Sequence, residues 1–259
     1  MEVADRVVVV TGAGAGIGAA FCRRIAREQP RLIVVSDLNQ DAAESIAREI
    51  GGLAVAADVS RESDIEHLIG ASIQAAGRLD IFVSNAGVTC KGGIDCSNAD
   101  WQRLWDVNVM SRLYAARACV PIMLEQGEGY LVHTASAAAL LTEIGSAGYS
   151  VTKHADLAMA EWLAVQYGKQ GVRVSCVCPL GVQTDMLDDE DPIHRYLHLH
   201  VISPEDAAEA ILNGIRDERF LILPHPEVAD FHQLKTQDRS RWIRGMQRLL
   251  QKLNWKKEM

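Results

Sequence analysis

The sequence predicts an α/β fold in which one domain contains a doubly wound parallel sheet of about seven strands with helices on both faces. Short aliphatic runs alternate with longer amphipathic segments along most of the chain. The aliphatic runs are continuous, which is typical of strands buried on both faces of a parallel sheet. The length of 259 residues suits one sizeable α/β domain and is short for two.

Expected strands and helices follow one another in regular order. The strands are the runs RVVVVTG, RLIVVSD, LAVAADV, LDIFVSNAG, GYLVHTAS, VRVSCVCP and FLILP. The helices are expected over residues 17–28, 40–50, 62–76, 101–125, 149–169 and 204–217. In such sheets a ligand binds beyond the carboxyl ends of the strands, where the strand order reverses. Residues directly after each strand are therefore the candidates for a functional site.

A glycine-rich stretch, TGAGAGIG at residues 11–18, lies between the first strand and the first helix. Glycines permit a tight turn and a close backbone approach to a pyrophosphate, whose charge the helix N-terminus stabilises. Glycines also serve turns that bind nothing, but this position between strand and helix favours a dinucleotide. The predicted cofactor contacts are Gly12, Gly14, Gly16, Ile17 and Gly18.

The second strand ends in Asp37, about 20 residues after the glycine-rich stretch. A carboxylate at this position can accept both hydroxyls of an adenosine ribose and would repel a 2′-phosphate. No basic residue follows, since the next residue is Leu38. NAD is therefore expected rather than NADP. The alternative is that Asp37 is only a helix cap or turn residue.

The third and fourth strands end in further candidates for the nucleotide site. A carboxylate there can reach the adenine amine, and small residues let the chain pass close to the nucleotide. These candidates are Asp58, Val59, Asn85, Ala86 and Gly87.

Four residues in the second half of the predicted sheet suggest catalysis. Tyr149 and Lys153 share one face of an expected helix, Ser136 follows the fifth strand, and Asn108 lies in DVNV. With TGxxxGxG and NAG, this order resembles the short-chain dehydrogenase/reductase family over roughly residues 5–223. The combination is more specific than any single motif. The alternative for Tyr149 and Lys153 is a surface or half-buried helical pair.

The resemblance implies a Rossmann-like fold and hydride transfer between NAD and an alcohol or carbonyl carbon. Tyr149 would exchange a proton with the substrate oxygen, and Ser136 would hold that oxygen. Lys153 would bind the nicotinamide ribose, and Asn108 would hold a water that connects Lys153 to solvent. One positive charge about 5 Å from a phenol favours the phenolate by about 3 kcal/mol at an effective dielectric near 20. Lys153 and the cationic nicotinamide are therefore expected to lower the pKa of Tyr149.

The resemblance also implies cofactor contacts after the sixth strand, at Pro179, Val182 and Thr184. The family usually has Pro-Gly there, whereas this chain has Leu180 between Pro179 and Gly181. The course of this turn is left open by the sequence. Ser84 also replaces the first Asn of the usual NNAG, a change that the family tolerates.

The substrate is expected to be a small alcohol or ketone. The segment AAALLTEIGSAG lies between Ser136 and Tyr149, and a lid is expected over about residues 184–203. The lid adds the apolar residues Met186, Leu187, Ile193 and Leu197. Apolar walls favour a lipophilic secondary alcohol or ketone.

The same lid contains three histidines within HRYLHLH, at His194, His198 and His200. Two of them could share a helix face and bind a metal. Hydride transfer to a nicotinamide requires no metal, so none is expected, and closure over the substrate is the preferred role.

Composition excludes several other classes of protein. The net charge of −8 argues against nucleic acid as a partner. The aliphatic runs are too short to span a membrane, and the N-terminus lacks a secretion signal, so a cytoplasmic location is expected. The six cysteines form no CxxC pair, which argues against zinc and against a disulfide framework. A functional disulfide between Cys90 and Cys96 is a minor alternative.

The C-terminal region differs from the rest of the chain in charge. Residues 235–259 contain eight basic and two acidic residues, a net charge of +6, which leaves −14 for residues 1–234. We therefore divide the chain into a dehydrogenase domain, 1–234, and a basic amphipathic tail helix, 235–259. The tail is expected to dock on its own domain or on a neighbouring subunit; a membrane surface or another partner is the alternative.

Two functional hypotheses follow from these patterns. The first is an NAD-dependent dehydrogenase that forms a homo-oligomer, a dimer or tetramer, as members of the family commonly do. The alternative is a non-catalytic NAD-binding redox sensor or scaffold protein, against which the presence of Ser136, Tyr149 and Lys153 counts.

Overall fold

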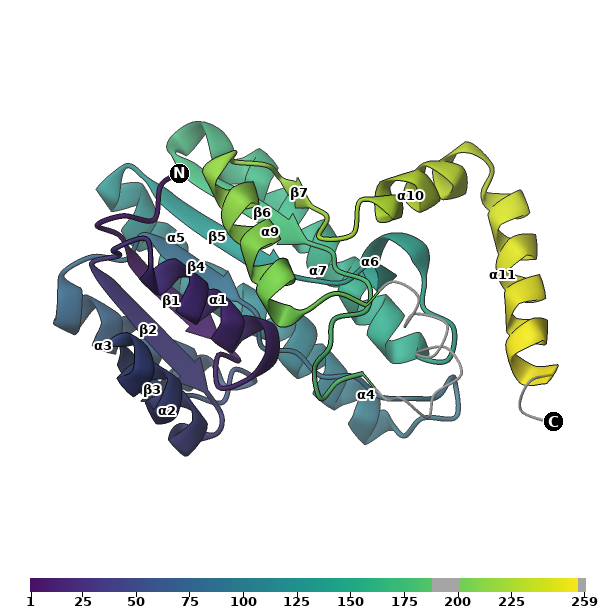
Figure 1. Ribbon diagram of the computed structural model, residues 1–259, viewed down its shortest axis with the longest axis horizontal. Helices are drawn as coiled ribbons and strands as arrows, with labels where there is room; N and C mark the ends of the chain where they lie inside the picture. The colour runs from purple at the N-terminus through teal and green to yellow at the C-terminus, as the bar shows by residue number, and fades with distance from the viewer. Residues whose placement is uncertain (188–200, 256–259) are drawn as a thin grey trace.

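The structure is a computed structural model that describes residues 1–187 and 201–255. It contains a sheet of seven parallel strands in the order β3-β2-β1-β4-β5-β6-β7 (Figure 1). The strands are β1 Val7–Thr11, β2 Leu32–Asp37, β3 Leu53–Ala56, β4 Ile81–Ser84, β5 Gly129–Thr134, β6 Val172–Val177 and β7 Leu221–Ile222. The predicted doubly wound sheet is confirmed. The strand order reverses between β1 and β4.

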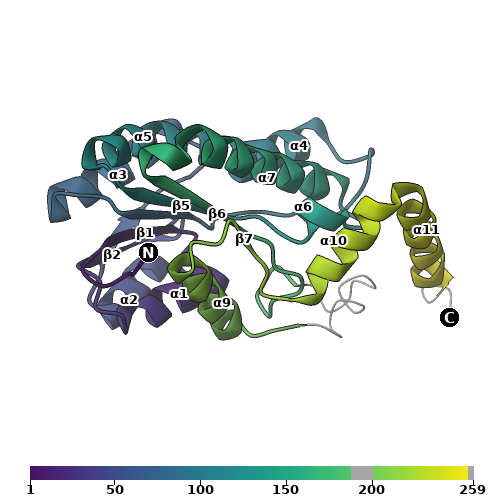
Figure 2. The same cartoon turned by 90° about the horizontal axis from the view of Figure 1, so that it is seen from above.

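Helices cover both faces of the sheet, as Figure 2 shows. One face carries α1 Gly16–Ala26, α2 Gln40–Ile50 and α9 Pro204–Arg216. The other carries α3 Glu62–Ala76, α5 Ser111–Gln126 and α7 Ala147–Tyr167. Shorter elements are α4 Asn98–Trp105, a π-helical turn Asp106–Met110, α6 Ala138–Leu141 and a 3₁₀ turn Gly168–Gln170. Two further helices, α10 Glu227–Gln237 and α11 Arg239–Trp255, follow β7.

The continuous aliphatic strands form two cores because neighbouring side chains point to opposite faces. Val9 packs with residues of α3, α5 and α7, whereas Val8 and Val10 pack with residues of α1, α2 and α9. All three valines are fully buried. A polar side chain at any of these positions would place an unsatisfied group in one of the two cores.

Several helix ends follow directly from local sequence. Ser203 and Asp206 form a capping box at the start of α9, with Pro204 in the first turn. Asn39 caps α2, which ends at Gly51 in a left-handed conformation. These capping residues stabilise the starts of α2 and α9, which lie near the carboxyl ends of the strands.

The helix expected over residues 101–125 differs in the structure. It begins earlier, at Asn98, and is interrupted by the π-helical turn Asp106–Met110. The Asn108 side chain bonds both the N–H and the carbonyl oxygen of Val88, at 2.9 Å each. These bonds tie the wide turn to the loop after β4, and such turns are often found at functional sites.

The C-terminal region consists of two helices that extend beyond the β7 edge of the sheet (Figures 1 and 2). The boundary expected between residues 234 and 235 lies inside α10. Lys235 is buried and donates a hydrogen bond to the carbonyl oxygen of Leu140, at 2.6 Å, which fixes α10 to α6. The docking of the rest of the tail stays a prediction.

Three further expectations concern the lid, membrane-spanning helices and the cysteines. The three lid histidines, and most of the expected lid, lie outside the described residues. Of the helices that the structure describes, none is long and apolar enough to cross a membrane. All six cysteines are free.

Candidate active site

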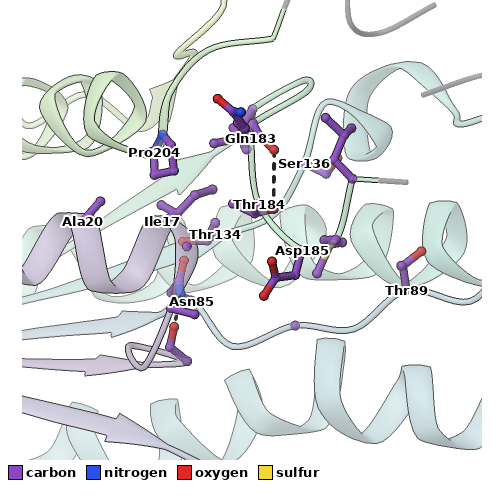
Figure 3. Close-up of a pocket in the computed structure, with 18 of the residues that line it drawn as sticks. Ile17, Ala20, Asn85, Thr89, Thr134, Ser136, Gln183, Thr184, Asp185 and Pro204 are labelled. Atoms are coloured by element: carbon purple, nitrogen blue, oxygen red, sulfur yellow. Dashed lines mark hydrogen bonds between the residues drawn. The ribbon is translucent and has the colours of Figure 1, made fainter. Parts of the chain in front are cut away.

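Two adjoining cavities of about 590 and 640 Å³ lie at the carboxyl ends of the strands. Gly12, Asp37, Ala86 and Gly87 line both of them. The two cavities therefore adjoin at the point where the strand order reverses. Figure 3 shows the first cavity, with Ile17 and Ala20 of α1, Asn85 and Thr89 after β4, and Thr134 and Ser136 at the end of β5.

The glycine-rich loop packs its backbone directly against the chain after β4. A Cβ atom at Gly12, which has a φ of +61°, would lie 2.7 Å from the Cα of Ala86. A Cβ at Gly18 would overlap the carbonyl oxygen of Gly12. Helix α1 then begins at Gly16 and turns its N-terminus toward the cavity. This cradle suits a pyrophosphate, because backbone N–H groups and the helix N-terminus favour an anion.

Asp37 lines both cavities and also holds the local backbone. One carboxylate oxygen accepts from the N–H of Gly14 at 2.9 Å, and the other accepts from the N–H of Asn39 at 3.0 Å. Asp37 therefore stabilises the turn and also lies at the position where the sequence predicts contact with a ribose.

Asn85 and Thr11 join the ends of β4 and β1. The Asn85 side chain donates to the carbonyl oxygens of Thr11 and Gly12, at 3.1 and 2.9 Å. The Thr11 hydroxyl accepts from the N–H groups of Asn85 and Ala86. Sequence reasoning did not single out Thr11, although its place at the strand end is a usable signal.

The second cavity is lined by two more residues that the sequence predicts to contact the nucleotide. Asp58 and Val59 follow β3 and line this space beside Leu38. The Asp58 carboxylate accepts from the N–H and hydroxyl of Ser60, at 3.0 and 2.7 Å. These bonds fix the carboxylate at the cavity wall.

Three of the four predicted catalytic residues lie on one wall of the first cavity. Ser136, Tyr149 and Lys153 line it, and the Ser136 hydroxyl lies close enough to the Tyr149 phenol to lower its pKa slightly. The ammonium of Lys153 lies 5.5 Å from the centre of the Tyr149 ring and donates to the carbonyl oxygen of Thr134 at 2.9 Å. A hydroxyl, a phenol and an ammonium thus converge on one space.

Asn108, the fourth predicted residue, lies behind this wall. It is fully buried, and its amide also donates to the Thr152 hydroxyl at 3.1 Å. Through Val88 and Thr152 it joins the loop after β4 to the helix that carries Tyr149 and Lys153. The structure therefore shows a bracing contact for the Asn108 side chain.

Burial sets the proton affinities of Tyr149 and Lys153. Burial and then the negative charge of Glu143 raise the pKa of Tyr149, against a smaller opposite effect of the Ser136 hydrogen bond. Burial and then the charge of Arg112 lower the pKa of Lys153 to about 8, and Asp156 opposes this. The chain's own groups therefore keep the phenol protonated, because desolvation outweighs the favourable contacts. The expected lowering of the pKa of Tyr149 is not produced by the protein alone.

The turn after β6, left open by the sequence, is fixed by a residue from beyond β7. The N–H of Leu180 donates to Nδ1 of His225, and Nε2 of His225 donates to the carbonyl oxygen of Gly181, both at 3.1 Å. The carbonyl oxygen of Pro179 accepts from the N–H of Ala137 at 2.7 Å. Sequence reasoning missed His225, which lies 45 residues from Leu180 and in no recognisable motif.

The rest of this segment reaches back over the cavity. Val182 pairs with Ile202, and the Thr184 hydroxyl donates to the carbonyl oxygen of Val182 at 3.4 Å (Figure 3). Pro179, Val182 and Thr184 all line the first cavity, where the sequence predicted cofactor contacts.

The substrate wall is more polar than the sequence suggested. Leu140 and Leu141 are buried in the core rather than lining the cavity, because α6 packs them toward the interior. Glu143 from the same segment does line the cavity, as do Gln183 and Asp185. Leu180, Met186 and Leu187 supply the apolar part of the lining.

Comparison with known proteins places these features in context. The family model described as "short chain dehydrogenase" matches residues 6–193. The chain is 31% identical over 231 residues to a mitochondrial borneol dehydrogenase of Lavandula x intermedia, covering 87% of this chain and 89% of that protein. It is 34% identical over 236 residues to 1-deoxy-11-beta-hydroxypentalenate dehydrogenase of Streptomyces exfoliatus, covering 88% and 86%.

Solved structures show the same similarity. A short chain dehydrogenase/reductase from Burkholderia phymatum in complex with NAD matches with a TM-score of 0.85 and 28% identity, over 92% of this chain and 95% of that one. A 3-ketoacyl-(acyl-carrier-protein) reductase from Brucella melitensis complexed with NADH matches with a TM-score of 0.77 and 27% identity, over 85% and 97%.

Proposed function

This chain belongs to the short-chain dehydrogenase family, and from that premise we propose that it transfers a hydride between NAD and a lipophilic secondary alcohol or ketone. That it is an oxidoreductase acting on CH–OH groups follows from its family. The observation that supports the finer proposal best is the convergence of Ser136, Tyr149 and Lys153 on the cavity that also contains the glycine-rich loop.

In this proposal the chain's own residues manage the proton and the substrate oxygen. The Ser136 hydroxyl donates to that oxygen and holds it beside the Tyr149 phenol. In reduction Tyr149 donates its proton to the oxygen; in oxidation it takes the proton back. The nicotinamide, when bound, would accept the hydride in oxidation and, in its reduced form, supply it in reduction; the positive charge of the oxidised form favours the phenolate. Lys153 orients the nicotinamide ribose.

The preference for NAD over NADP rests on Asp37. Its carboxylate lines both cavities, and a 2′-phosphate beside it would meet like charge. The nucleotide contacts proposed with it are Gly12, Gly14, Gly16, Ile17, Gly18, Asp58, Val59, Asn85, Ala86, Gly87, Pro179, Val182 and Thr184.

The substrate class is supported by two observations. Leu180, Met186 and Leu187 give the first cavity apolar surface. One relative is named for borneol, which is itself a secondary alcohol on a hydrocarbon skeleton. Glu143, which also lines the cavity, would restrict how an apolar substrate can lie beside Tyr149.

We also infer a homo-oligomer, a dimer or tetramer. Trp162 and Val165 of α7 are large apolar side chains with 58% and 85% of their surface exposed. An interface between subunits would remove this apolar surface from water. Light scattering after size exclusion tests the oligomeric state. The division at residue 234 and a cytoplasmic location stay predictions.

The proposed function is tested with a panel of hydrophobic secondary alcohols, offered with NAD and separately with NADP, while the absorbance of the reduced nicotinamide is followed. We expect turnover with NAD. Tyr149→Phe should lower kcat by about 10³-fold, within the range for general acid–base groups, while NAD binding persists. Tyr130→Phe is the matched control. It removes a buried tyrosine hydroxyl that bonds the Ser175 hydroxyl, and Tyr130 does not line the cavity.

Other outcomes would change the proposal in defined ways. Faster turnover with NADP would refute the argument from Asp37. Tight NAD binding with no turnover of any alcohol would favour the alternative of a redox sensor or scaffold. Equal activity of the Tyr149→Phe and wild-type proteins would remove Tyr149 from the chemistry.

A further inference from the structure

A buried cluster of charged and ionisable side chains lies directly behind the catalytic wall. It consists of Arg112 on α5, His133 on β5 and Asp156 on α7, whose side chains are 1, 2 and 0% exposed. Nε of Arg112 lies 3.3 Å from Oδ2 of Asp156, and Nδ1 of His133 lies 2.8 Å from Oδ1 of the same residue. Each carboxylate oxygen therefore has a partner from a different element.

The guanidinium of Arg112 also joins four segments that build the active site. One terminal nitrogen donates to the carbonyl oxygens of Ala86 and Val107, at 2.8 and 2.9 Å. The other donates to those of Ser84 and Thr134, at 3.3 and 3.4 Å. These carbonyls belong to the ends of β4 and β5, to the loop after β4, and to the π-helical turn with Asn108.

Lys153 is connected to this cluster through one shared acceptor. The carbonyl oxygen of Thr134 accepts from Lys153 at 2.9 Å and from Arg112 at 3.4 Å. Asp156 follows Lys153 by about one helical turn, so both side chains leave α7 on the same face. A shift of Arg112 would therefore move both the acceptor of Lys153 and its electrostatic surroundings.

The groups that act on the Lys153 ammonium come from three elements: Arg112 on α5, Asp156 on α7, and the thiols of Cys176 and Cys178 on or just after β6. The two charged groups have opposite effects, since Arg112 lowers the pKa of Lys153 and Asp156 raises it. Burial raises the pKa of Asp156, but Arg112 and the His133 hydrogen bond outweigh it, and the pKa falls to about 2. Asp156 is therefore an anion at neutral pH.

A buried ion pair is poorly explained by stability alone. Removing two charges from water is costly, and replacing such a pair by well-packed apolar residues is often neutral or stabilising. Arg112 and Asp156 lie in an otherwise close-packed layer between α5, α7 and β5. Their presence beside Lys153 is better explained by an effect on the site.

We propose that Arg112 and Asp156 are positioning residues for hydride transfer: together they fix the Thr134 carbonyl that holds Lys153, and they balance each other's charge on its ammonium. His133 completes the arrangement by occupying the second oxygen of Asp156. This inference rests on the role proposed above for Lys153.

The two residues predict opposite effects when either is changed alone. Without the positive charge of Arg112, Asp156 acts on Lys153 unopposed, and the ammonium holds its proton to higher pH. Without the negative charge of Asp156, Arg112 acts unopposed, and the proton leaves at lower pH. A merely structural role would not produce shifts of opposite sign.

The experiment is an NMR titration of lysine side chains labelled at the ε-carbon, in the cofactor-free protein, with Lys153→Arg identifying the signal. We expect a wild-type midpoint near pH 8. Arg112→Met should raise that midpoint by about one pH unit and Asp156→Asn should lower it by about as much. Arg112→Met combined with Asp156→Leu should return it close to the wild-type value.

Activity provides the second readout. Each single variant should lower kcat by about 10- to 100-fold, and the double variant should recover part of that loss. Arg112→Lys keeps the charge but not the contacts to four carbonyls, so it should restore the titration midpoint without restoring kcat. It also serves as the mild variant if Arg112→Met folds poorly.

Asp80→Asn is the matched control, because Asp80 is another fully buried carboxylate with arginine partners, at the opposite end of β4. It should leave the Lys153 titration unchanged. Shifts of the same sign in both single variants, or no shift in either, would overturn the inference.

The titration and the activity assay also separate this inference from the proposed function. If the shifts occur but the wild-type protein turns over no alcohol, the effect of Arg112 and Asp156 on Lys153 stands and the proposed function fails. If the protein turns over an alcohol but the shifts do not occur, the proposed function stands and the positioning role fails.

Discussion

The two ends of the sheet both concentrate charge, but they use it differently. At the amino end, Asp80 is fully buried while its partners Arg6 and Arg78 are 25% and 33% exposed, and Glu128 contacts both arginines at the surface. At the carboxyl end, Arg112, Asp156 and Lys153 are all buried. Water therefore solvates the cations at one end and is largely excluded from the charges at the other.

The backbone contacts of the two clusters explain the difference. Asp80 accepts from the N–H of Val7 at 2.8 Å and so fastens the start of β1 to the start of β4. Arg112 donates to carbonyl oxygens that border the cavity instead. Of the side chains that the structure describes, the Thr134 hydroxyl beside that cavity is one of two buried ones without a hydrogen-bond partner. The contacts at the amino end stabilise the fold. The carboxyl end contains buried charges and an unpartnered hydroxyl that cost stability, and these lie beside the candidate site.

The largest effect that would test this comparison is expected at the amino end. Asp80→Ala removes the partner of two arginines and of the Val7 N–H, so it should lower the free energy of unfolding by about 3 kcal/mol. The kcat of the folded protein should not change. Urea unfolding and steady-state kinetics measure the two quantities; a fall in kcat beyond the unfolded fraction would contradict the division of roles.

Acid titration tests the carboxyl end. The pKa of Asp156 is about 2 in the folded protein against an ordinary 3.8, so the unfolded chain takes up its proton first as the pH falls. Its contribution to stability is complete above about pH 4 and is lost between about pH 4 and pH 2. The loss should amount to about 2 kcal/mol. Urea unfolding at several pH values should show that loss in the wild-type protein and a shallower decline in Asp156→Asn.

His225 sharpens the comparison because it bonds the turn that lines the cavity, at Leu180 and Gly181. His225→Phe leaves the N–H of Leu180 and the carbonyl oxygen of Gly181 without this partner, so the turn over the cavity should loosen. We expect the KM for NAD to rise by about 10-fold, or about 1.4 kcal/mol. His225→Gln can still donate and accept, and it should recover part of the affinity. An unchanged KM in His225→Phe would separate the turn from cofactor binding.

The smallest effect is expected for an ion pair at neither end. Arg117 of α5 and Glu62 of α3 lie 3.0 Å apart, with side chains 56% and 41% exposed. Solvent and salt screen such a pair, so Arg117→Ala should change the free energy of unfolding by no more than about 0.5 kcal/mol. Thermal unfolding measures it, and a loss as large as that of Asp80→Ala would show that burial does not decide which pairs stabilise this fold.

Much of the site followed from short-range patterns. TGAGAGIG predicts a loop that must let two backbones touch, and Gly12 and Gly18 do lie against Ala86 and the loop itself. The four-residue spacing of Tyr149 and Lys153 predicts a shared helix face, and both line one cavity. Such features are readable because they depend on residues near one another in the chain.

Other features differ from what the local sequence pattern predicts. The AAALL segment predicts an apolar substrate wall, yet α6 packs Leu140 and Leu141 into the core and leaves Glu143 at the cavity. The pattern around Asn108 predicts ordinary helix, and the structure has a π-helical turn there. In each case the outcome depends on which neighbour the segment packs against, and a hydrophobic pattern does not encode that neighbour.

The sequence by itself determined the alternation of strands and helices, the family and the order of the predicted catalytic residues, because periodicity and motif spacing act within a few turns of chain. Only the tertiary structure decided that Arg112 meets Asp156, 44 residues away, and that His225 holds the turn at Leu180. The physical reason is that these polar groups acquire their partners when separate strands and helices align. Their burial, and with it the pKa values of Tyr149 and Lys153, is set by the assembled layers.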